Sequence, residues 1–184
     1  MWGGPRGAVA SETLSNYLDA LDRLMLVEAI PAWRPHMRSR TRLRTTPVNH
    51  FVDPSLAASA LGLGVDELSK DLEAAGLHFE SLVARDLRVY SQPLGAALSS
   101  WRDSRTGAQI DIVLELPDGT WAGIEVKLGE NAADEAAASL LRMADKIDHD
   151  RHGEPAALIV ITGGRYSYKR ADGVCVVPIT ALGP

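Results

Sequence analysis

The stretch covering residues 109–127 constrains the fold more than any other, because it contains two alternating segments joined by a turn. Strand side chains point to opposite faces with a period of two, so this alternation is typical of half-buried strands. Between the segments, Pro117-Asp118-Gly119 favours a tight turn, since proline presets φ and glycine accepts a positive φ. We predict a β-hairpin in which each strand has one apolar and one charged face. The apolar positions are Ile110, Ile112 and Leu114 in the first strand and Ile124, Val126 and Leu128 in the second.

The charged face of this hairpin is a candidate metal site. Folding brings Asp111 near Glu125 and Lys127, and the last two project together because they are two residues apart on one strand. Carboxylate oxygens suit the hard cation Mg²⁺, and a neighbouring ammonium can orient water or stabilise charge. Taken alone, Glu125 and Lys127 fit an ordinary ion pair on an exposed strand face. Glu115 lies nearer the turn, and we expect it to be solvated.

The remaining segments predict an α/β protein with a mixed sheet flanked by helices. Leucines and alanines at helical spacing predict helices over residues 11–24, 55–61, 66–75, 77–90 and 131–148, the last being the longest. We expect Gly76 to separate the third and fourth of these. Apolar runs predict strands at 26–30, 48–52, 98–101, 156–161 and 174–177, and the continuous run at 156–161 is typical of a buried central strand.

A third carboxylate, Glu80, lies on the helix predicted over residues 77–90, beside its apolar stripe. By itself Glu80 fits a surface helix residue. Together with Asp111, Glu125 and Lys127 it makes a set of three acids and one ammonium drawn from a helix and two adjacent strands. The whole set favours a site over a chance ion pair.

Charge is distributed unevenly along the chain. The net charge is −5, yet residues 29–52 hold five arginines and no acid, which leaves 14 basic and 24 acidic residues elsewhere. A local basic stretch of this kind indicates contact with a polyanion such as DNA, and a solvated basic loop is an equal alternative. The candidate DNA-binding residues are Arg38, Arg40, Arg42 and Arg44. A single cysteine and the lack of an apolar span predict a cytoplasmic protein with no membrane segment.

The order of Glu80, Asp111 and Glu125-Val126-Lys127 resembles the PD-(D/E)XK nuclease superfamily, also described as restriction-endonuclease-like. In that superfamily a helix often carries a Glu, one strand carries the Asp and the next carries Glu-x-Lys. The resemblance implies that Glu80, Asp111, Glu125 and Lys127 are catalytic. It also implies that the three carboxylates bind Mg²⁺ or Mn²⁺ while Lys127 positions the nucleophile.

A closer resemblance covers almost the whole chain. The segments HFESLVARDL, WRDSRTGAQIDIVLELPDGTWAGIEVKLGE and GVCVVPITALG resemble the C-terminal domain of unknown function of prokaryotic AAA+ family ATP-binding proteins. That family implies an N-terminal ATPase module, a winged-helix segment and this nuclease-like domain. The pattern includes Trp101-Arg102, and this chain departs from it at Gln109, where the family usually has an acid. One charge beside Asp111 is therefore lost.

These resemblances imply a domain organisation with residues 1–10 as a flexible leader, 11–54 as a partial winged-helix segment and 55–184 as the PD-(D/E)XK nuclease-like domain. No G-x-x-x-x-G-K-[ST] motif occurs, so we expect this chain not to be an ATPase by itself. The expected function is a Mg²⁺-dependent DNA phosphodiesterase associated with an ATPase module. The alternative is a catalytically silent domain that binds DNA or a partner and regulates the ATPase.

Overall fold

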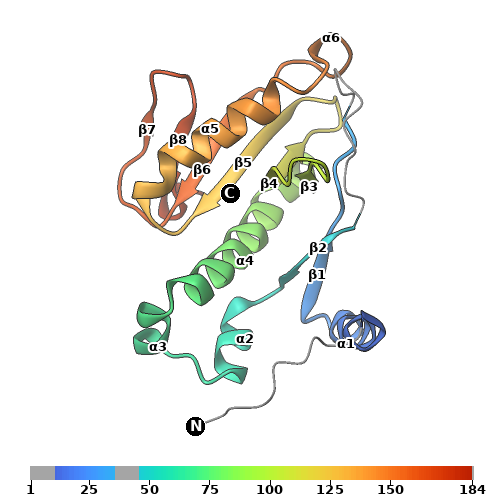
Figure 1. Ribbon diagram of the computed structural model, residues 1–184, viewed down its shortest axis with the longest axis vertical. Helices are drawn as coiled ribbons and strands as arrows, with labels where there is room; N and C mark the ends of the chain where they lie inside the picture. The colour runs from blue at the N-terminus through green and yellow to red at the C-terminus, as the bar shows by residue number, and fades with distance from the viewer. Residues whose placement is uncertain (1–10, 36–45, 184) are drawn as a thin grey trace.

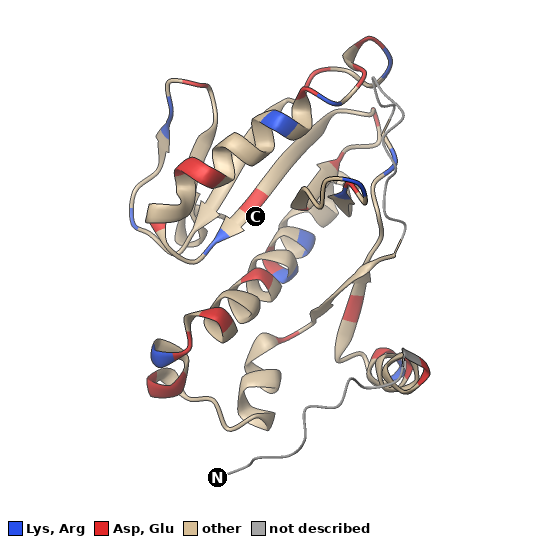
Figure 2. Ribbon diagram, in the orientation of Figure 1, with Lys and Arg blue, Asp and Glu red and all other residues tan. Residues whose placement is uncertain are grey.

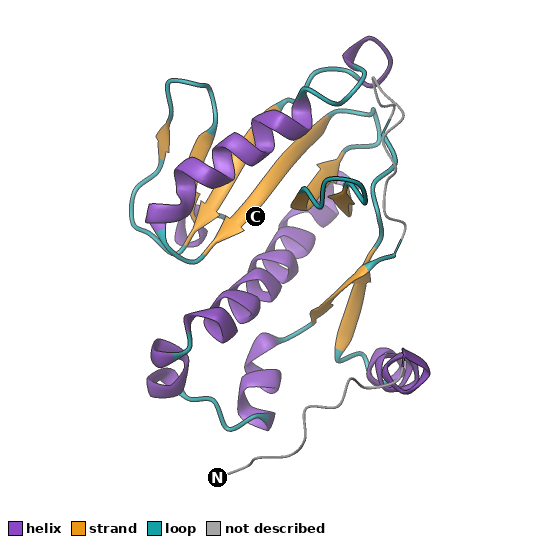
Figure 3. Cartoon of the chain, viewed as in Figure 1, coloured by secondary structure: helices purple, strands orange, loops and turns teal. Residues whose placement is uncertain are grey.

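A computed structural model describes residues 11–35 and 46–183. Within these residues the chain forms a six-stranded mixed sheet, a separate two-stranded antiparallel sheet and flanking helices (Figures 1 and 3). The predicted α/β class with a mixed sheet flanked by helices is therefore confirmed. The leader at residues 1–10 and the arginines Arg38, Arg40, Arg42 and Arg44 lie outside the described residues.

The large sheet has the strand order β3-β4-β5-β6-β8-β7. Its first three strands form an antiparallel meander, while β5, β6 and β8 are mutually parallel and β7 is an antiparallel edge. The predicted buried strand at 156–161 is confirmed as β6, which lies between β5 and β8. The strands are β3 (Ala97–Arg102), β4 (Gln109–Glu115), β5 (Trp121–Lys127), β6 (Ala157–Thr162), β7 (Tyr168–Lys169) and β8 (Cys175–Pro178).

Helices cover both faces of this sheet. Helix α4 (Leu72–Ser91) contributes Phe79 and Val83 to one apolar cluster, and α5 (Ala133–Ala144) contributes Leu140 and Met143 to the other (Figure 1). The prediction that β4 has one apolar and one charged face is wrong, because Val113 is fully buried in the α5 cluster. A sheet covered on both faces selects apolar residues on both faces of its central strands.

Helix α4 is longer than the sequence predicts. It begins at Leu72, where the Asp71 carboxylate caps the helix by accepting a hydrogen bond from the Ala74 N–H at 3.0 Å. Gly76 lies inside the helix and does not separate two helices, since a helical glycine costs only about 1 kcal/mol and the cap and the packing offset it. The preceding helix, α3 (Val65–Lys70), is correspondingly shorter than expected.

The prediction of one continuous helix over residues 131–148 is wrong in its extent. A 3₁₀ turn at Glu130–Ala132 precedes α5, and a separate short helix, α6 (His149–His152), follows it. Between the two helices Ile147 is fully buried, and Asp148 has an extended backbone with ψ of 91°. Burying Ile147 against the core therefore bends the chain out of the helix, and α4 is the longest helix described.

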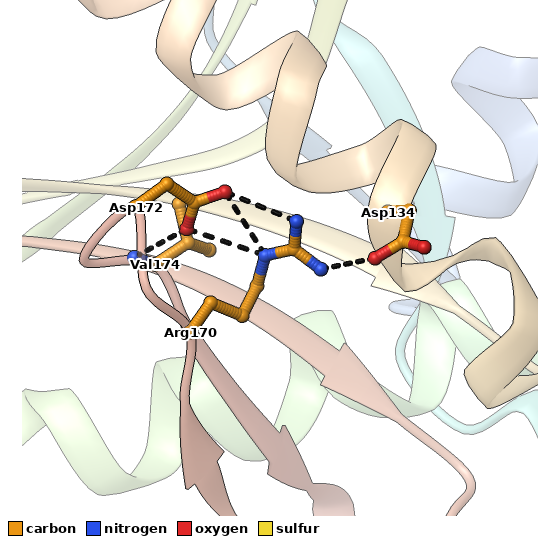
Figure 4. A network of polar contacts seen from close by, with 4 residues as sticks. All are labelled: Asp134, Arg170, Asp172 and Val174. Atoms are coloured by element: carbon orange, nitrogen blue, oxygen red, sulfur yellow. Dashed lines mark hydrogen bonds and ion pairs between the residues drawn. The ribbon is translucent and has the colours of Figure 1, made fainter.

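A polar network ties the β7–β8 hairpin to the start of α5 (Figure 4). The Arg170 guanidinium pairs with Asp134 on α5 and with Asp172 in the hairpin, the second contact at 3.0 Å. The Asp172 Oδ1 atom also accepts a hydrogen bond from the Val174 N–H at 3.2 Å. These contacts hold the β7–β8 hairpin against the start of α5.

The N-terminal part follows the predicted order of a helix and two strands. Helix α1 (Ser11–Arg23) leads into β1 (Val27–Ile30), which pairs antiparallel with β2 (Val48–Phe51). Helix α2 (Pro54–Ala60) begins after the Asp53 cap. In the winged-helix interpretation, the loop between β1 and β2 is the wing. This loop includes residues outside those described, so the interpretation stays a prediction.

The N-terminal part is packed directly onto the large sheet. Ile30 belongs to the α4 cluster and Trp33 to the α5 cluster. The backbone after β1 also extends the sheet edge, since the Ser100 N–H donates to Pro31 O at 2.8 Å and the Trp33 N–H donates to Ser100 O at 2.7 Å. No helix in the described part of the chain has the length and apolarity to cross a membrane.

Candidate functional site

The site begins where β4 and β5 separate. Their register ends at the pair of Ile112 and Ile124, three residues before the end of β5. The Asp111 Oδ2 atom then accepts a hydrogen bond from the Val126 N–H at 2.8 Å. The carboxylate thus takes the place of a backbone carbonyl in the ladder, and this holds Asp111 against the end of β5.

A β-bulge beside Asp111 explains its position. Ser99 of β3 pairs with Val113, but Trp101 pairs with Ile110, so β4 has one more residue than β3 between these pairs. A bulge bends its strand and re-aims the neighbouring side chains. It directs Asp111 into the gap between β4 and β5 while the flanking isoleucines stay buried.

Glu125 and Lys127 project from the end of β5, which has left its pairing with β4 but remains paired with β6. The Lys127 Nζ atom lies 2.9 Å from Glu125 Oε2 and 3.7 Å from Asp111 Oδ2. Glu125 is only 3% exposed, whereas Lys127 is partly open to solvent. The structure therefore brings these three predicted residues together as an ion-paired group.

Glu80 reaches the same region from α4. It is half-buried, and it lines a cavity together with Asp111. Figure 2 shows acidic and basic positions along α4 and at the carboxyl end of β5, the two elements that supply most of the group. We call Glu80, Asp111, Glu125 and Lys127 the carboxylate–lysine cluster.

Burial and mutual repulsion shape the electrostatics of this cluster. Burial raises the pKa of Glu80 to about 7, with the Asp111 charge acting in the same direction and Lys127 opposing it. Burial and then Asp111 likewise raise the pKa of Glu125. Burial lowers the pKa of Lys127, but the charges of Asp111 and Glu125 outweigh it and the net shift is upward. Three acids share one ammonium, so added positive charge would stabilise the cluster.

The cluster has the donor chemistry for Mg²⁺, which binds through one or two carboxylates and keeps several waters. Asp111 and Glu125, which both pair with Lys127, are the two oxygen donors available for it, and Glu80 lies nearby on α4. Across residues 11–35 and 46–183, no three or more His, Cys, Asp or Glu side chains are grouped so that they could hold a metal ion.

The cavity beside Glu80 and Asp111 has a volume of about 260 Å³. The N-terminal part supplies one wall, including Thr46 and His50, and the start of the β3–β4 hairpin supplies another, including Arg102. The site is thus assembled from the N-terminal part, α4 and the large sheet.

His50 and Arg102 do not stand out as site residues in the sequence. His50 is buried on β2, its Nδ1 atom lies 3.4 Å from Ser81 Oγ, and burial lowers its pKa. A polar residue inside a short apolar strand is the only sequence signal for it. Arg102 is visible only as part of the Trp101-Arg102 pattern.

Two acids have roles that the sequence does not predict. Glu115 is not solvated as expected: its Oε2 atom accepts a hydrogen bond from Trp33 Nε1 at 2.6 Å. Asp103 lies in the predicted polar turn but is fully buried, and it pairs with Lys146 Nζ at 2.9 Å. The hydrogen bond from Lys146 holds the pKa of Asp103 well below its usual range. Both acids connect distant segments and lie outside the cluster.

Two family descriptions match the chain. Residues 75–182 match the family described as "Domain of unknown function (DUF4143)", and residues 6–67 match "Domain of unknown function (DUF8612)". The first match contains every member of the carboxylate–lysine cluster. The second contains the candidate DNA-binding arginines. No curated protein matches the sequence.

One solved structure resembles the chain weakly. It is the refined half-complex from the tetradecameric assembly of Thermococcus gammatolerans McrB AAA+ hexamers with bound McrC. The sequence identity is 9% and the TM-score is 0.40, and the similarity covers 89% of this chain and 59% of that chain. The present chain therefore spans less than two thirds of the length of that solved chain. A TM-score this low does not establish a common fold.

Proposed function

This chain belongs to the family described as "Domain of unknown function (DUF4143)", and we propose that its carboxylate–lysine cluster is the site of a metal-dependent phosphodiesterase acting on DNA. The observation that carries the proposal is that Asp111 and Glu125 meet the Lys127 ammonium where β4 and β5 separate, while Glu80 of α4 lines the same cavity as Asp111. Two members of the cluster, Glu80 and Asp111, also line a cavity of about 260 Å³. The sequence resemblance to PD-(D/E)XK nucleases supports the same chemistry.

The proposal gives each residue a role. Asp111 and Glu125 would hold Mg²⁺ or Mn²⁺, with Glu80 as a third or water-mediated ligand. A bound ion of this kind lowers the pKa of water and offsets charge on a phosphoryl group. Lys127, which Glu125 already holds at 2.9 Å, would orient the nucleophile and stabilise negative charge on the phosphate.

The partners in this proposal are DNA and an ATPase module. The family is typically C-terminal in AAA-ATPase proteins, and the sequence resemblance expects such a module before this domain. The arginines at positions 38, 40, 42 and 44 would contact DNA phosphates without reading bases. ATP hydrolysis by the module would then act on DNA held near the cluster.

Plasmid nicking with Mg²⁺ or Mn²⁺ tests the proposal. We expect Asp111→Asn and Lys127→Met to lower the nicking rate by about 100-fold or more, the usual cost of removing a group that stabilises the transition state. Glu135→Gln and Lys70→Ala are matched controls, since both residues are exposed and neither lines the cavity, and they should keep the wild-type rate. Nicking that survives both cluster substitutions would come from a contaminant and would refute the proposal.

A second candidate is a catalytically silent domain that binds DNA or a protein partner and regulates the ATPase. The ion pairs of Lys127 with both Glu125 and Asp111 favour it, because they neutralise part of the cluster without any metal. Titration calorimetry with Mn²⁺ separates the two candidates. Heat of binding that disappears in Asp111→Asn supports the phosphodiesterase, whereas no binding by the wild type supports the silent domain.

A further inference from the structure

Arg102 is the last residue of β3, and it is an exposed cation at the edge of the cavity. Within the described part of the chain its side chain has no ion pair or hydrogen bond. The arginines of a neighbouring pocket that shares His50 are paired, Arg85 with Asp86 at 2.8 Å and Arg88 with Glu28 at 2.6 Å. Arg102 therefore keeps its full hydrogen-bonding capacity for a ligand.

The lining of the cavity carries charges of both signs. Glu80 and Asp111 supply acid, and Arg102 supplies positive charge. A phosphodiester fits such a site, because its non-bridging oxygens need cationic donors while its reacting phosphorus needs the metal and the nucleophile. The volume of about 260 Å³ is below the roughly 300–1,000 Å³ of drug-sized pockets, so it suits one phosphodiester group and part of its sugar.

The local fold gives Arg102 a fixed position. It pairs directly across the ladder with Gln109 of β4, two residues from Asp111. A guanidinium on a paired strand can meet two phosphate oxygens with two parallel N–H donors, which a lysine cannot do. The same pairing holds the Arg102 backbone on the strand next to the one that carries Asp111.

We propose that Arg102 is the phosphate-positioning residue of this site and that the cavity receives a phosphodiester of the DNA substrate. This inference rests on the proposed function in its choice of DNA, but it does not require cleavage. Arg102 acts by holding the phosphate beside Asp111, so its loss affects binding as well as rate.

Fluorescence anisotropy with a labelled DNA duplex tests the inference, with Ca²⁺ in place of Mg²⁺ and at several salt concentrations. We expect Arg102→Ala to weaken binding about tenfold and to reduce the slope of log affinity against log salt by about one, the loss of a single phosphate contact. Arg102→Lys keeps the charge, so it should restore the slope and only part of the affinity. Arg105→Ala is the matched control, because Arg105 is an exposed arginine in the adjoining turn that does not line the cavity.

The outcomes separate this inference from the proposed function. If Arg102→Ala behaves like Arg105→Ala while the wild type nicks DNA, the inference fails and the phosphodiesterase stands. If the wild type does not nick DNA but Arg102→Ala alone lowers the affinity and the slope, the phosphodiesterase fails and the phosphate site stands. A wild-type protein that binds no DNA at low salt overturns both.

Discussion

Glu80 and Glu125 show how burial in a folded chain raises the pKa of an acid. Burial removes water from both carboxyl groups, and the charge of Asp111 adds to the effect. Each group therefore binds a proton more tightly in the folded state than in the unfolded chain. Such a group stabilises the fold at low pH and loses that contribution as the pH rises through its folded pKa.

This linkage predicts the effect of Glu80→Gln. The pKa of Glu80 rises from 4.5 to about 7, so its ionisation costs stability between these two values and the full cost is present above pH 7. The neutral glutamine has no such cost, and because Glu80 is partly exposed we expect a gain of about 1 kcal/mol at pH 8 and almost none at pH 4.5. Urea unfolding at both pH values, with EDTA present, measures the difference. An equal effect at the two pH values would show that ionisation of Glu80 is not the cause.

At the scale of elements, two glycines differ in the space around them, and only one lies where a helix packs closely on the sheet. Gly76 lies in α4, and a methyl group added there would meet nothing within 4 Å. Gly123 lies in β5 under α5, and the same methyl group would come within 3.0 Å of Met143 Cε and 3.2 Å of Leu140 Cδ2. The first glycine only weakens its helix, whereas the second creates the space that lets α5 pack on the strand carrying Glu125 and Lys127.

Alanine at these two positions should therefore act in opposite directions. We expect Gly76→Ala to stabilise the protein by about 0.5–1 kcal/mol through helix propensity. We expect Gly123→Ala to destabilise it by about 1–3 kcal/mol through overpacking. Denaturant unfolding of both variants under one set of conditions makes the comparison. A loss of stability in Gly76→Ala would contradict a continuous α4.

At the scale of the whole molecule, the N-terminal part and the large sheet are one packed unit. Trp33 is 4% exposed, its ring centroid lies 4.8 Å from that of Trp121, and its Nε1–H donates to Glu115. Neither Trp33 nor His50 falls within residues 75–182, the range matched by the DUF4143 family. The matched range therefore leaves out Trp33, which belongs to the core, and His50, which lines the cavity.

We expect Trp33→Ala to destabilise the whole protein by about 3–5 kcal/mol, the usual cost of truncating a buried aromatic side chain. Trp33→Phe keeps an aromatic ring and loses the hydrogen bond, so a smaller cost of about 1 kcal/mol is expected. A single cooperative transition, followed by both near-UV and far-UV circular dichroism, is the appropriate measurement. If Trp33→Ala removes only a fraction of the circular-dichroism signal, the N-terminal part and the large sheet unfold independently.

The sequence by itself determined the local structure around the site. The alternation of residues 109–127 and the Pro117-Asp118-Gly119 turn specify a hairpin, and Gly119 has the positive φ of 85° that such a turn requires. The separation of two residues between Glu125 and Lys127 places them on one side of β5, where they form the 2.9 Å ion pair. These features could be predicted because they depend on backbone geometry over a few residues.

Only the tertiary structure decided how the distant parts of the site meet. The bulge in β4 and the early end of its pairing with β5 bring Asp111 to the Val126 N–H. The packing of the N-terminal part then adds His50 to a cavity shared with Arg102. No local pattern records these contacts, because each results from burying apolar surface between segments that lie far apart in the chain.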